Sequence, residues 1–177
     1  MPALTQAEIR RLLELLNDEL RQPEVFGELY LVGGAVMCLA YNARPSTADV
    51  DALFRPAAEV RQAAARAATR AKVPPDWLND GVKGYLSQEA DFAPFLELDH
   101  LRVMIARPEY LLAMKCLAMR IGAEFHDEAD VRFLLRLLDI RSYEQALTVI
   151  TRYYPRERFP QKTLYALEEL LSEAQNR

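Results

Sequence analysis

The stretch from Leu29 to Phe54 constrains the fold of this chain more strongly than any other part of the sequence. It opens with an apolar run, Leu29–Val32, whose length suits a buried strand. Two glycines, Gly33 and Gly34, follow directly, and a helical pattern then runs from Ala35 to about Asn42. The sequence therefore predicts a strand that turns into a helix at a glycine corner.

A second strand follows this helix and carries two acidic side chains. Pro45 ends the helix, because the residue before a proline is pushed out of the α region. Asp49 and Asp51 are separated only by Val50, so on a strand both side chains leave the same face. Neighbouring carboxylates repel each other unless a cation lies between them, and Mg²⁺ (or Mn²⁺) prefers oxygen ligands that it shares with substrate phosphates. Asp49 and Asp51 are the predicted metal ligands.

The glycine corner has a chemical use of its own. Glycines at a strand-to-helix junction let the backbone approach a ligand closely, and the start of the following helix offers free N–H groups and a positive dipole end. Gly33 and Gly34 therefore predict a place for phosphate. A phosphate cradle beside a pair of metal-binding carboxylates is the equipment of phosphoryl or nucleotidyl transfer.

At these residues the sequence resembles a known group of enzymes. The diglycine, a helix and then Arg44-Pro-Ser-Thr47-Ala-Asp49-Val-Asp51 resemble the signature of the polymerase-β-like nucleotidyltransferase superfamily. The ending Arg-x-x-Thr-x-Asp-x-Asp is most similar to the AbiEii/AbiGii-type toxin branch and its small bacterial relatives. The opening Leu-Val-Gly-Gly-Ala-Val is also similar to CCA-adding enzymes, but an Arg-Asp pair follows there, whereas Met37-Cys38 stands here.

The resemblance implies a metal-dependent nucleotidyltransferase that uses Mg²⁺ or Mn²⁺ and moves a nucleoside monophosphate from a nucleoside triphosphate to an acceptor. It implies that Asp49 and Asp51 are the catalytic residues. The acceptor is an RNA, a protein or a small molecule, and an antitoxin protein is the implied partner. The residues expected to hold the triphosphate are Gly33, Gly34, Arg44, Thr47 and Lys115.

Two of these residues also have ordinary structural interpretations. Arg44 is either a surface cation near a helix end, where positive charge is mildly favoured, or a group that points toward the triphosphate or the carboxylates. Thr47 either caps the turn or hydrogen-bonds a phosphate. Both alternatives stay open for each residue on the sequence alone.

A second block of resemblance lies between Pro108 and Leu138. The run Pro-Glu-Tyr-Leu-Leu-Ala-Met-Lys115, followed by Arg120 and Asp127-Glu-Ala-Asp130, is similar to a block of the toxin branch in which a lysine and an acidic helix start complete the site. Lys115 is then a phosphate ligand, although a lysine in an apolar run usually extends to solvent. Asp127 equally fits a plain helix cap.

One part of the superfamily pattern is missing. A later strand usually supplies a third carboxylate, but the natural strand here, Leu101–Ala106, holds no acid. Glu97, Asp99 and Asp127 are the candidates to replace it. This departure favours an alternative function, a catalytically degenerate module that binds nucleotides or a protein partner. A helical scaffold unrelated to nucleotides is a third interpretation.

Composition and charge limit the remaining possibilities. The net charge of −4 gives no strong basic field, so tight generic binding of nucleic acid is not predicted. Cys38 and Cys116 both lie in apolar helical runs, which predicts buried free thiols in a reducing cytosol. We expect no signal peptide, and no run reaches the roughly 18 apolar residues of a membrane span, so the predicted location is cytoplasmic.

The predicted fold class is α+β, a nucleotidyltransferase-like small mixed sheet flanked by helices, with a helical C-terminal half. The boundary is expected after residue 106, giving a core of residues 1–106 and a helical part of residues 107–177. The loop Val73–Asp80 carries Trp77, either as a hydrophobic plug or as a wall for a base. The predicted helices cover residues 5–20, 55–72, 108–121, a following helix that starts at Asp127 and continues over 131–138, and then 142–153 and 162–174; the later strands cover 92–98 and 101–106. Thr5 with Glu8 and Ser142 with Gln145 predict capping pairs at the starts of the first helix and of the helix over 142–153.

Overall fold

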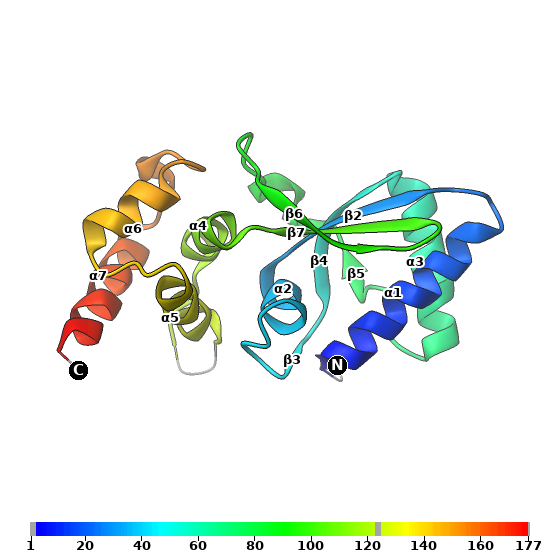
Figure 1. The fold of residues 1–177 in the computed structure, drawn as a ribbon, viewed down its shortest axis with the longest axis horizontal. Helices are drawn as coiled ribbons and strands as arrows, with labels where there is room; N and C mark the ends of the chain where they lie inside the picture. The colour runs from blue at the N-terminus through cyan, green and yellow to red at the C-terminus, as the bar shows by residue number, and fades with distance from the viewer. Residues whose placement is uncertain (1–2, 123–124, 177) are drawn as a thin grey trace. The chain divides into compact units, whose positions relative to one another are not determined.

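The computed structural model describes residues 3–122 and 125–176, and the chain forms two compact units. The first comprises Met1–Tyr85 and Phe92–Ala106, and the second comprises Leu86–Asp91 and Arg107–Arg177. The first unit contains a mixed five-stranded sheet with helices, and the described part of the second is helical (Figure 1). The α+β class predicted from the sequence is therefore confirmed.

The two observed units differ from the predicted parts, residues 1–106 and 107–177, in one segment. Leu86–Asp91 groups with the second unit, although it lies well before that boundary. The Ser87 N–H donates a hydrogen bond to the Tyr110 hydroxyl at 3.0 Å, and the Arg107 N–H donates to the Asp91 carbonyl at 2.9 Å. These long-range hydrogen bonds, which no local pattern indicates, assign the segment to the helical unit.

The main sheet has the strand order β5-β4-β2-β7-β6. Strand β2 pairs antiparallel with β4 and parallel with β7, β4 pairs parallel with β5, and β6 pairs antiparallel with β7. A separate two-stranded sheet joins β1 to β3. The strands are β1 (Leu4–Thr5), β2 (Gly27–Val32), β3 (Ser46–Thr47), β4 (Val50–Arg55), β5 (Leu78–Asn79), β6 (Phe92–Glu97) and β7 (Leu101–Ala106).

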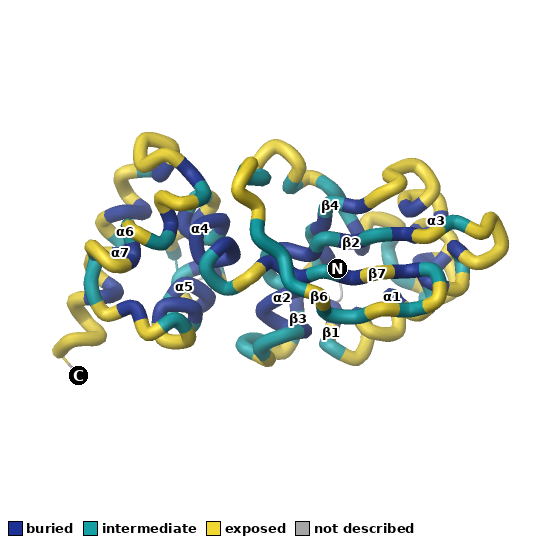
Figure 2. The backbone as a smooth tube through the Cα atoms, turned by 45° about the horizontal axis from the view of Figure 1, so that its top comes forward, coloured by how far each residue is buried: buried dark blue, intermediate teal, exposed yellow. Residues whose placement is uncertain are grey.

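The burial pattern of β4 decides which of its residues can form a site. Val50, Ala52 and Phe54 are buried, whereas Asp51 and Leu53 are half-buried, so the strand alternates between two faces of the sheet (Figure 2). The buried face packs against α3 (Ala57–Ala71), whose Arg61 lies over the Phe54 ring, and α3 lies beside α1 (Gln6–Arg21) on the same side of the sheet (Figure 1). Asp51 therefore leaves the sheet on the face opposite these helices.

Helix α1 begins with the capping box that the sequence predicts. The Glu8 N–H donates to the Thr5 hydroxyl at 3.3 Å, and the Thr5 N–H donates to the Glu8 carboxylate at 2.7 Å. Such a box satisfies two of the otherwise unpaired donors at a helix start. The apolar side chains Ile9, Leu12, Leu13, Leu16 and Leu20 are buried, and each contributes about 1.5–3 kcal/mol by leaving water, whereas Leu15, which the pattern also places on the apolar face, is half-buried.

Helix α2 (Gly33–Leu39) starts and ends earlier than the predicted span from Ala35 to Asn42. Gly33 is already its first residue, so Gly33 and Gly34, the glycine corner, are the first two residues of the helix. At the other end Asn42 has a φ of 50°, a left-handed conformation that cannot continue a helix. Helix α2 is buried along most of its length (Figure 2).

The segment predicted as a loop at Val73–Asp80 contains the short strand β5. Trp77 is a plug, because its side chain is buried and its indole N–H donates to the Ala64 carbonyl of α3 at 3.0 Å. The alternative in which Trp77 forms the wall of a base-binding cleft is wrong. A 3₁₀ helix, η1 (Gly81–Tyr85), follows β5.

The second unit contains α4 (Pro108–Ala118), α5 (Asp127–Leu137), α6 (Tyr143–Ile150), η2 (Arg156–Arg158) and α7 (Gln161–Gln175). Helix α4 ends at Ala118, three residues before the predicted end, and α5 is the separate helix predicted to follow it, with Asp127 as its first residue. The predicted capping pair of α6 is confirmed, since the Gln145 N–H donates to the Ser142 hydroxyl at 3.2 Å.

Both cysteines are buried and free, as predicted. Burial raises the pKa of Cys116 to about 12, so this thiol stays protonated and unreactive at neutral pH. Among the described residues, no helix is both long and apolar enough to cross a lipid bilayer.

Candidate active site

The two predicted metal ligands lie at the start of β4. Asp51 is the second residue of this strand, and Asp49 lies directly before its first residue. Only one of the two predicted ligands is therefore part of the strand. Asp51 pairs in register with Val32, the last residue of β2. The antiparallel pairing therefore brings the acidic start of β4 to the end of β2, where Gly33 begins α2.

Gly33 is in direct reach of this carboxylate. A Cβ atom placed on Gly33 would lie 3.1 Å from the Asp51 Oδ2 atom, which is tighter than most real contacts of such an atom. Gly33 also has a φ of 67°, in the left-handed region that costs other L-residues roughly 1–2 kcal/mol. The backbone at this position thus needs glycine for its conformation and for the close approach of Asp51.

Gly34 makes a second close approach, to Arg44 and Thr47. A Cβ atom on Gly34 would lie 2.7 Å from the Thr47 Oγ1 atom and 2.8 Å from the Arg44 Nη1 atom. Arg44 and Thr47 therefore lie against the glycine corner. The structure brings five of the predicted site residues together in the first unit: Gly33, Gly34, Arg44, Thr47 and Asp51.

Thr47 has the turn role that was one of its two interpretations. Its hydroxyl donates a hydrogen bond to the Asp49 carbonyl at 3.2 Å, and its side chain is almost fully buried. This contact fixes the backbone just before β4 and so places Asp49. The phosphate-binding role of Thr47 stays a prediction.

Asn79 is a member of the site that the sequence analysis missed. Its Nδ2 group donates to the Asp49 Oδ2 atom at 3.0 Å. Asn79 is the second residue of β5 and pairs in register with Asp51. A two-residue strand that follows two prolines gives no periodic signal, so only the parallel pairing of β5 with β4 identifies this neighbour.

The environment of Asp49 raises the pKa of its carboxyl group. Burial is the main cause, because it disfavours the charged form, and the negative charge of Asp51 adds to it. The hydrogen bond from Asn79 acts in the opposite direction, and the charge of Asp76 raises the pKa further. A cation bound at this place would relieve both the burial of charge and the repulsion between the carboxylates.

The residues present fit a divalent cation of the Mg²⁺ type. Asp49 and Asp51 offer hard oxygen ligands, and Mg²⁺ is commonly held by one or two carboxylates together with water and substrate phosphates. In the described parts of the chain, no group of three or more histidine, cysteine or acidic side chains is arranged to hold a metal ion. The remaining ligands of such an ion would therefore come from water and phosphate oxygens.

Two of the three candidates for a third carboxylate lie at the other end of the sheet. Glu97 pairs in register with Arg102, which pairs with Glu28 at the start of β2, whereas Asp51 lies opposite the end of β2. The Glu97 carboxylate accepts a hydrogen bond from Arg102 at 3.0 Å. Asp99 follows β6 at this same end, with Arg21 at 3.9 Å, so neither acid reaches the acidic pair.

The comparisons with known proteins add no family to this geometry. No protein-family model matches the chain, and no curated protein and no solved structure is significantly similar to it.

Lys115 and Asp127, the third candidate, belong to the second unit and meet there. The Lys115 Nζ atom lies 2.7 Å from the Asp130 carboxylate and 3.5 Å from the Asp127 carboxylate. Its side chain is only 10% exposed, so the lysine does not extend to solvent. Lys115 as a triphosphate ligand stays a prediction, and in this structure its ammonium group is engaged by two carboxylates.

Asp127 is not the helix cap that the sequence equally allowed. The cap is His126, and Asp127 is the first helical residue of α5. Its carboxylate accepts hydrogen bonds from the backbone N–H and the Nε group of Arg120 at 3.0 and 2.9 Å. Burial alone would raise the pKa of Asp127, but these hydrogen bonds and the charge of Lys115 outweigh burial and lower it.

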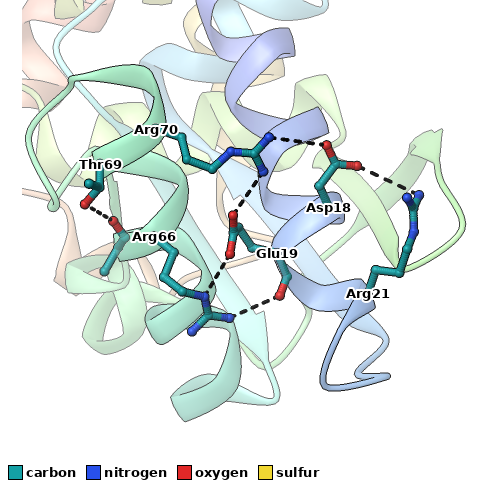
Figure 3. A network of polar contacts seen from close by, with 7 residues as sticks. Asp18, Glu19, Arg21, Arg66, Thr69 and Arg70 are labelled. Atoms are coloured by element: carbon teal, nitrogen blue, oxygen red, sulfur yellow. Dashed lines mark hydrogen bonds and ion pairs between the residues drawn. The ribbon is translucent and has the colours of Figure 1, made fainter.

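A separate cavity of about 480 Å³ lies between α1 and α3. Its arginines are engaged by acids of α1, since Arg66 donates to the Glu19 carboxylate at 2.9 Å and Arg70 donates to it at 3.0 Å (Figure 3). The cavity is lined by Asp18, Glu19, Gln22, Pro23, Glu59, Gln62, Arg66 and Arg70.

Proposed function

We propose that this protein is a metal-dependent nucleotidyltransferase with a polymerase-β-like fold. One observation carries the proposal: the acidic pair and the glycine corner meet at one half-buried place, where the Asp51 carboxylate lies 3.1 Å from the Cβ position of Gly33. A carboxylate in contact with a glycine backbone supports a metal-binding site beside a phosphate-binding site.

Each residue of the site has a distinct task in this proposal. Asp49 and Asp51 hold the divalent cation, which when bound neutralises negative charge on the phosphates and polarises the α-phosphate. Gly33 and Gly34 let the backbone N–H groups approach the triphosphate, because no Cβ atom stands in the way. Arg44, whose guanidinium lies against Gly34, supplies a fixed positive charge for the β and γ phosphates.

The reaction is an in-line displacement. The oxygen of an acceptor hydroxyl forms a bond to the α-phosphorus and its proton passes to water, while the bond from this phosphorus to the bridging oxygen of the β-phosphate breaks and pyrophosphate leaves with that electron pair. We propose an RNA, a protein hydroxyl or a small molecule as the acceptor. The resemblance to the AbiEii/AbiGii-type branch supports a toxin that acts in the cytoplasm and is neutralised by a partner protein.

A second candidate function is a nucleotide-binding or protein-interaction module without turnover. The absence of an acid from β7, together with the position of Glu97 and Asp99 at the far end of the sheet, favours it. A site with only two carboxylates can still bind a nucleotide with its metal ion. The two candidates differ in one measurable property, transfer of the nucleotide.

The test is an incubation with the four α-labelled nucleoside triphosphates, Mg²⁺ or Mn²⁺ and total RNA. We expect labelled product with the wild type and only background with Asp49→Asn and Asp51→Asn. Glu97→Gln is the matched control, because it removes a carboxylate of the same sheet at the opposite end and should leave transfer unchanged. Binding of nucleotide without transfer would support the nucleotide-binding form of the second candidate, and no binding at all would contradict the enzyme and leave only a protein-interaction module.

A further inference from the structure

The short strand β5 delivers one side chain to the acidic site. Because β5 runs parallel to β4, Leu78 pairs with Val50 on the helix-covered side and Asn79 pairs with Asp51 on the other side. The Asn79 amide reaches past its register partner to Asp49, where Nδ2 donates to Oδ2 at 3.0 Å. The strand therefore contributes a hydrogen-bond donor to the acidic pair.

The orientation of this amide is fixed from its other side. The Gly81 N–H donates to the Asn79 Oδ1 atom at 3.2 Å. Since a backbone N–H can only donate, the oxygen of the amide must face Gly81, and the NH₂ group must then face Asp49. The turn after β5 thus determines which end of the amide the carboxylate meets.

Strand β5 is itself held firmly in place. The Val50 N–H donates to the Trp77 carbonyl at 2.7 Å, directly before the paired residues. The Trp77 side chain is 1% exposed and anchors the strand to α3 through its hydrogen bond to the Ala64 carbonyl. Because Trp77 is buried and held by these two hydrogen bonds, the nearby Asn79 has little freedom to move away from Asp49.

Asp49 is consequently held at both its backbone and its side chain, by Thr47 and by Asn79. We propose that Asn79 is a positioning residue of the acidic site, whose amide holds the Asp49 carboxylate in the orientation that accepts a divalent cation beside Asp51. This inference rests on the proposed function, since it assigns Asn79 a role toward the metal ion. Groups that orient a metal ligand in this way usually matter for affinity as well as for activity.

The first test uses the metal ion alone, without nucleotide. The dissociation constant of Mn²⁺ is measured by electron paramagnetic resonance for the wild type, Asn79→Ala, Asp49→Ala and Asp80→Asn. We expect Asp49→Ala to lose binding and Asn79→Ala to weaken it by roughly ten-fold or more. Asp80→Asn, a change of the next residue, which pairs with Arg61 and Lys83, is the control and should bind like the wild type.

The second test does not depend on the metal ion. A double-mutant cycle compares the melting temperatures of the wild type, Asn79→Ala, Asp49→Ala and the double variant. We expect Asn79→Ala to lower the melting temperature by about 2–4 °C in the wild type but by less than about half of that when Asp49 is already alanine. If Asn79→Ala does not fold, Asn79→Ser, which keeps a short polar side chain, replaces it in both tests.

The results separate this inference from the function on which it rests. Equal Mn²⁺ affinity of the wild type and Asn79→Ala, or strictly additive shifts in the cycle, would overturn the role of Asn79. A wild type that binds no Mn²⁺ through Asp49 would overturn it too, together with the proposed metal seat. Weakened Mn²⁺ binding by Asn79→Ala in a protein that transfers no nucleotide would leave the role intact and remove only the enzymatic proposal.

Discussion

Each unit of the molecule contains a pair of aspartates, and the two pairs have opposite electrostatic surroundings. In the first unit, burial and the charge of Asp51 raise the pKa of Asp49. In the second unit, Arg120 and Lys115 lower the pKa of Asp127 despite its burial. In the first pair the surroundings disfavour the ionised form of Asp49, whereas in the second pair the protein's own cations favour the ionised form of Asp127.

This difference separates a candidate binding site from a structural ion cluster. The buried Lys115 of α4 forms ion pairs with two carboxylates at the start of α5, the next helix along the chain. Such a cluster needs no ligand, and removing one member leaves an uncompensated buried charge. The acidic pair at Asp49 and Asp51 adjoins Gly33, which lies in close contact with the Asp51 carboxylate. The comparison therefore predicts different responses to mutation, pH and metal.

The largest effect is expected from Lys115→Met, which would break the cluster of the second unit. The side chains of Lys115 and Asp130 are 10% and 4% exposed, so the loss should be about 3–5 kcal/mol of unfolding free energy. Urea unfolding followed by circular dichroism measures it. The control is Arg120→Met, whose side chain is 63% exposed and should contribute about 1 kcal/mol or less. Equal losses from the two variants would show that the cluster is not a buried one.

The cluster should also respond to pH in a defined direction. Because the folded chain lowers the pKa of Asp127 below the usual 3.8, its ionised form stabilises the fold at neutral pH, and this contribution is lost as the pH falls through the lowered value. Asp127→Asn should therefore lose about 1–3 kcal/mol at pH 7, with a smaller difference from the wild type below pH 3.8.

The matched control is Asp139→Asn, which removes an exposed acid of the same unit that pairs only locally, with Arg141. Its stability should stay within about 0.5 kcal/mol of the wild type at every pH. A pH-independent loss in Asp127→Asn would mean that its carboxylate acts by shape alone and not through its charge.

The sequence could predict the first of these two regions far better than the second. Gly33, Gly34, Arg44, Thr47 and Asp51 lie within one strand, helix and strand, so short-range rules bring them together. Asn79 was missed because it joins the site only through the pairing of β5 with β4.

The same limit explains the errors in the second unit. An apolar run with one lysine predicts a lysine that extends to solvent or binds phosphate, but Lys115 meets two carboxylates of α5, the next helix along the chain. The periodicity of apolar residues indicates which face of a helix is buried. It does not indicate with which carboxylate a buried lysine forms an ion pair. Ion pairs between separate helices are tertiary features.

The next prediction concerns the glycine corner, which has no counterpart in the cluster of the second unit. Gly33→Ala forces a side chain into a left-handed backbone with a φ of 67° and places its Cβ 3.1 Å from the Asp51 carboxylate. We expect a loss of about 1–2 kcal/mol. Gly84→Ala is the control, because nothing lies within 4 Å of its Cβ position. Unfolding followed by Trp77 fluorescence, the only tryptophan, measures both variants. A loss no larger in Gly33→Ala than in the control would contradict a crowded corner.

The smallest effect, and the one that distinguishes the two regions most directly, is expected from Asp49→Asn. A raised pKa in the folded chain means that ionised Asp49 opposes folding; this penalty is absent below pH 3.8, grows as the pH rises from 3.8 to the raised value, and is constant above it. Without metal, Asp49→Asn should therefore be more stable than the wild type at pH 7, by about 1 kcal/mol or less because the site is partly open to solvent. The gain should fade toward pH 3.8, the reverse of the trend for Asp127→Asn.

Divalent metal should then reverse the order of the two proteins. A ligand that binds only the folded state stabilises it according to its concentration relative to the dissociation constant, so Mn²⁺ should raise the melting temperature of the wild type and leave that of Asp49→Asn unchanged. If Asp49→Asn is less stable than the wild type without metal, the carboxylate is a structural group like Asp127. The contrast between the two aspartate pairs would then disappear, and with it the physical reason for placing the ligand site in the first unit.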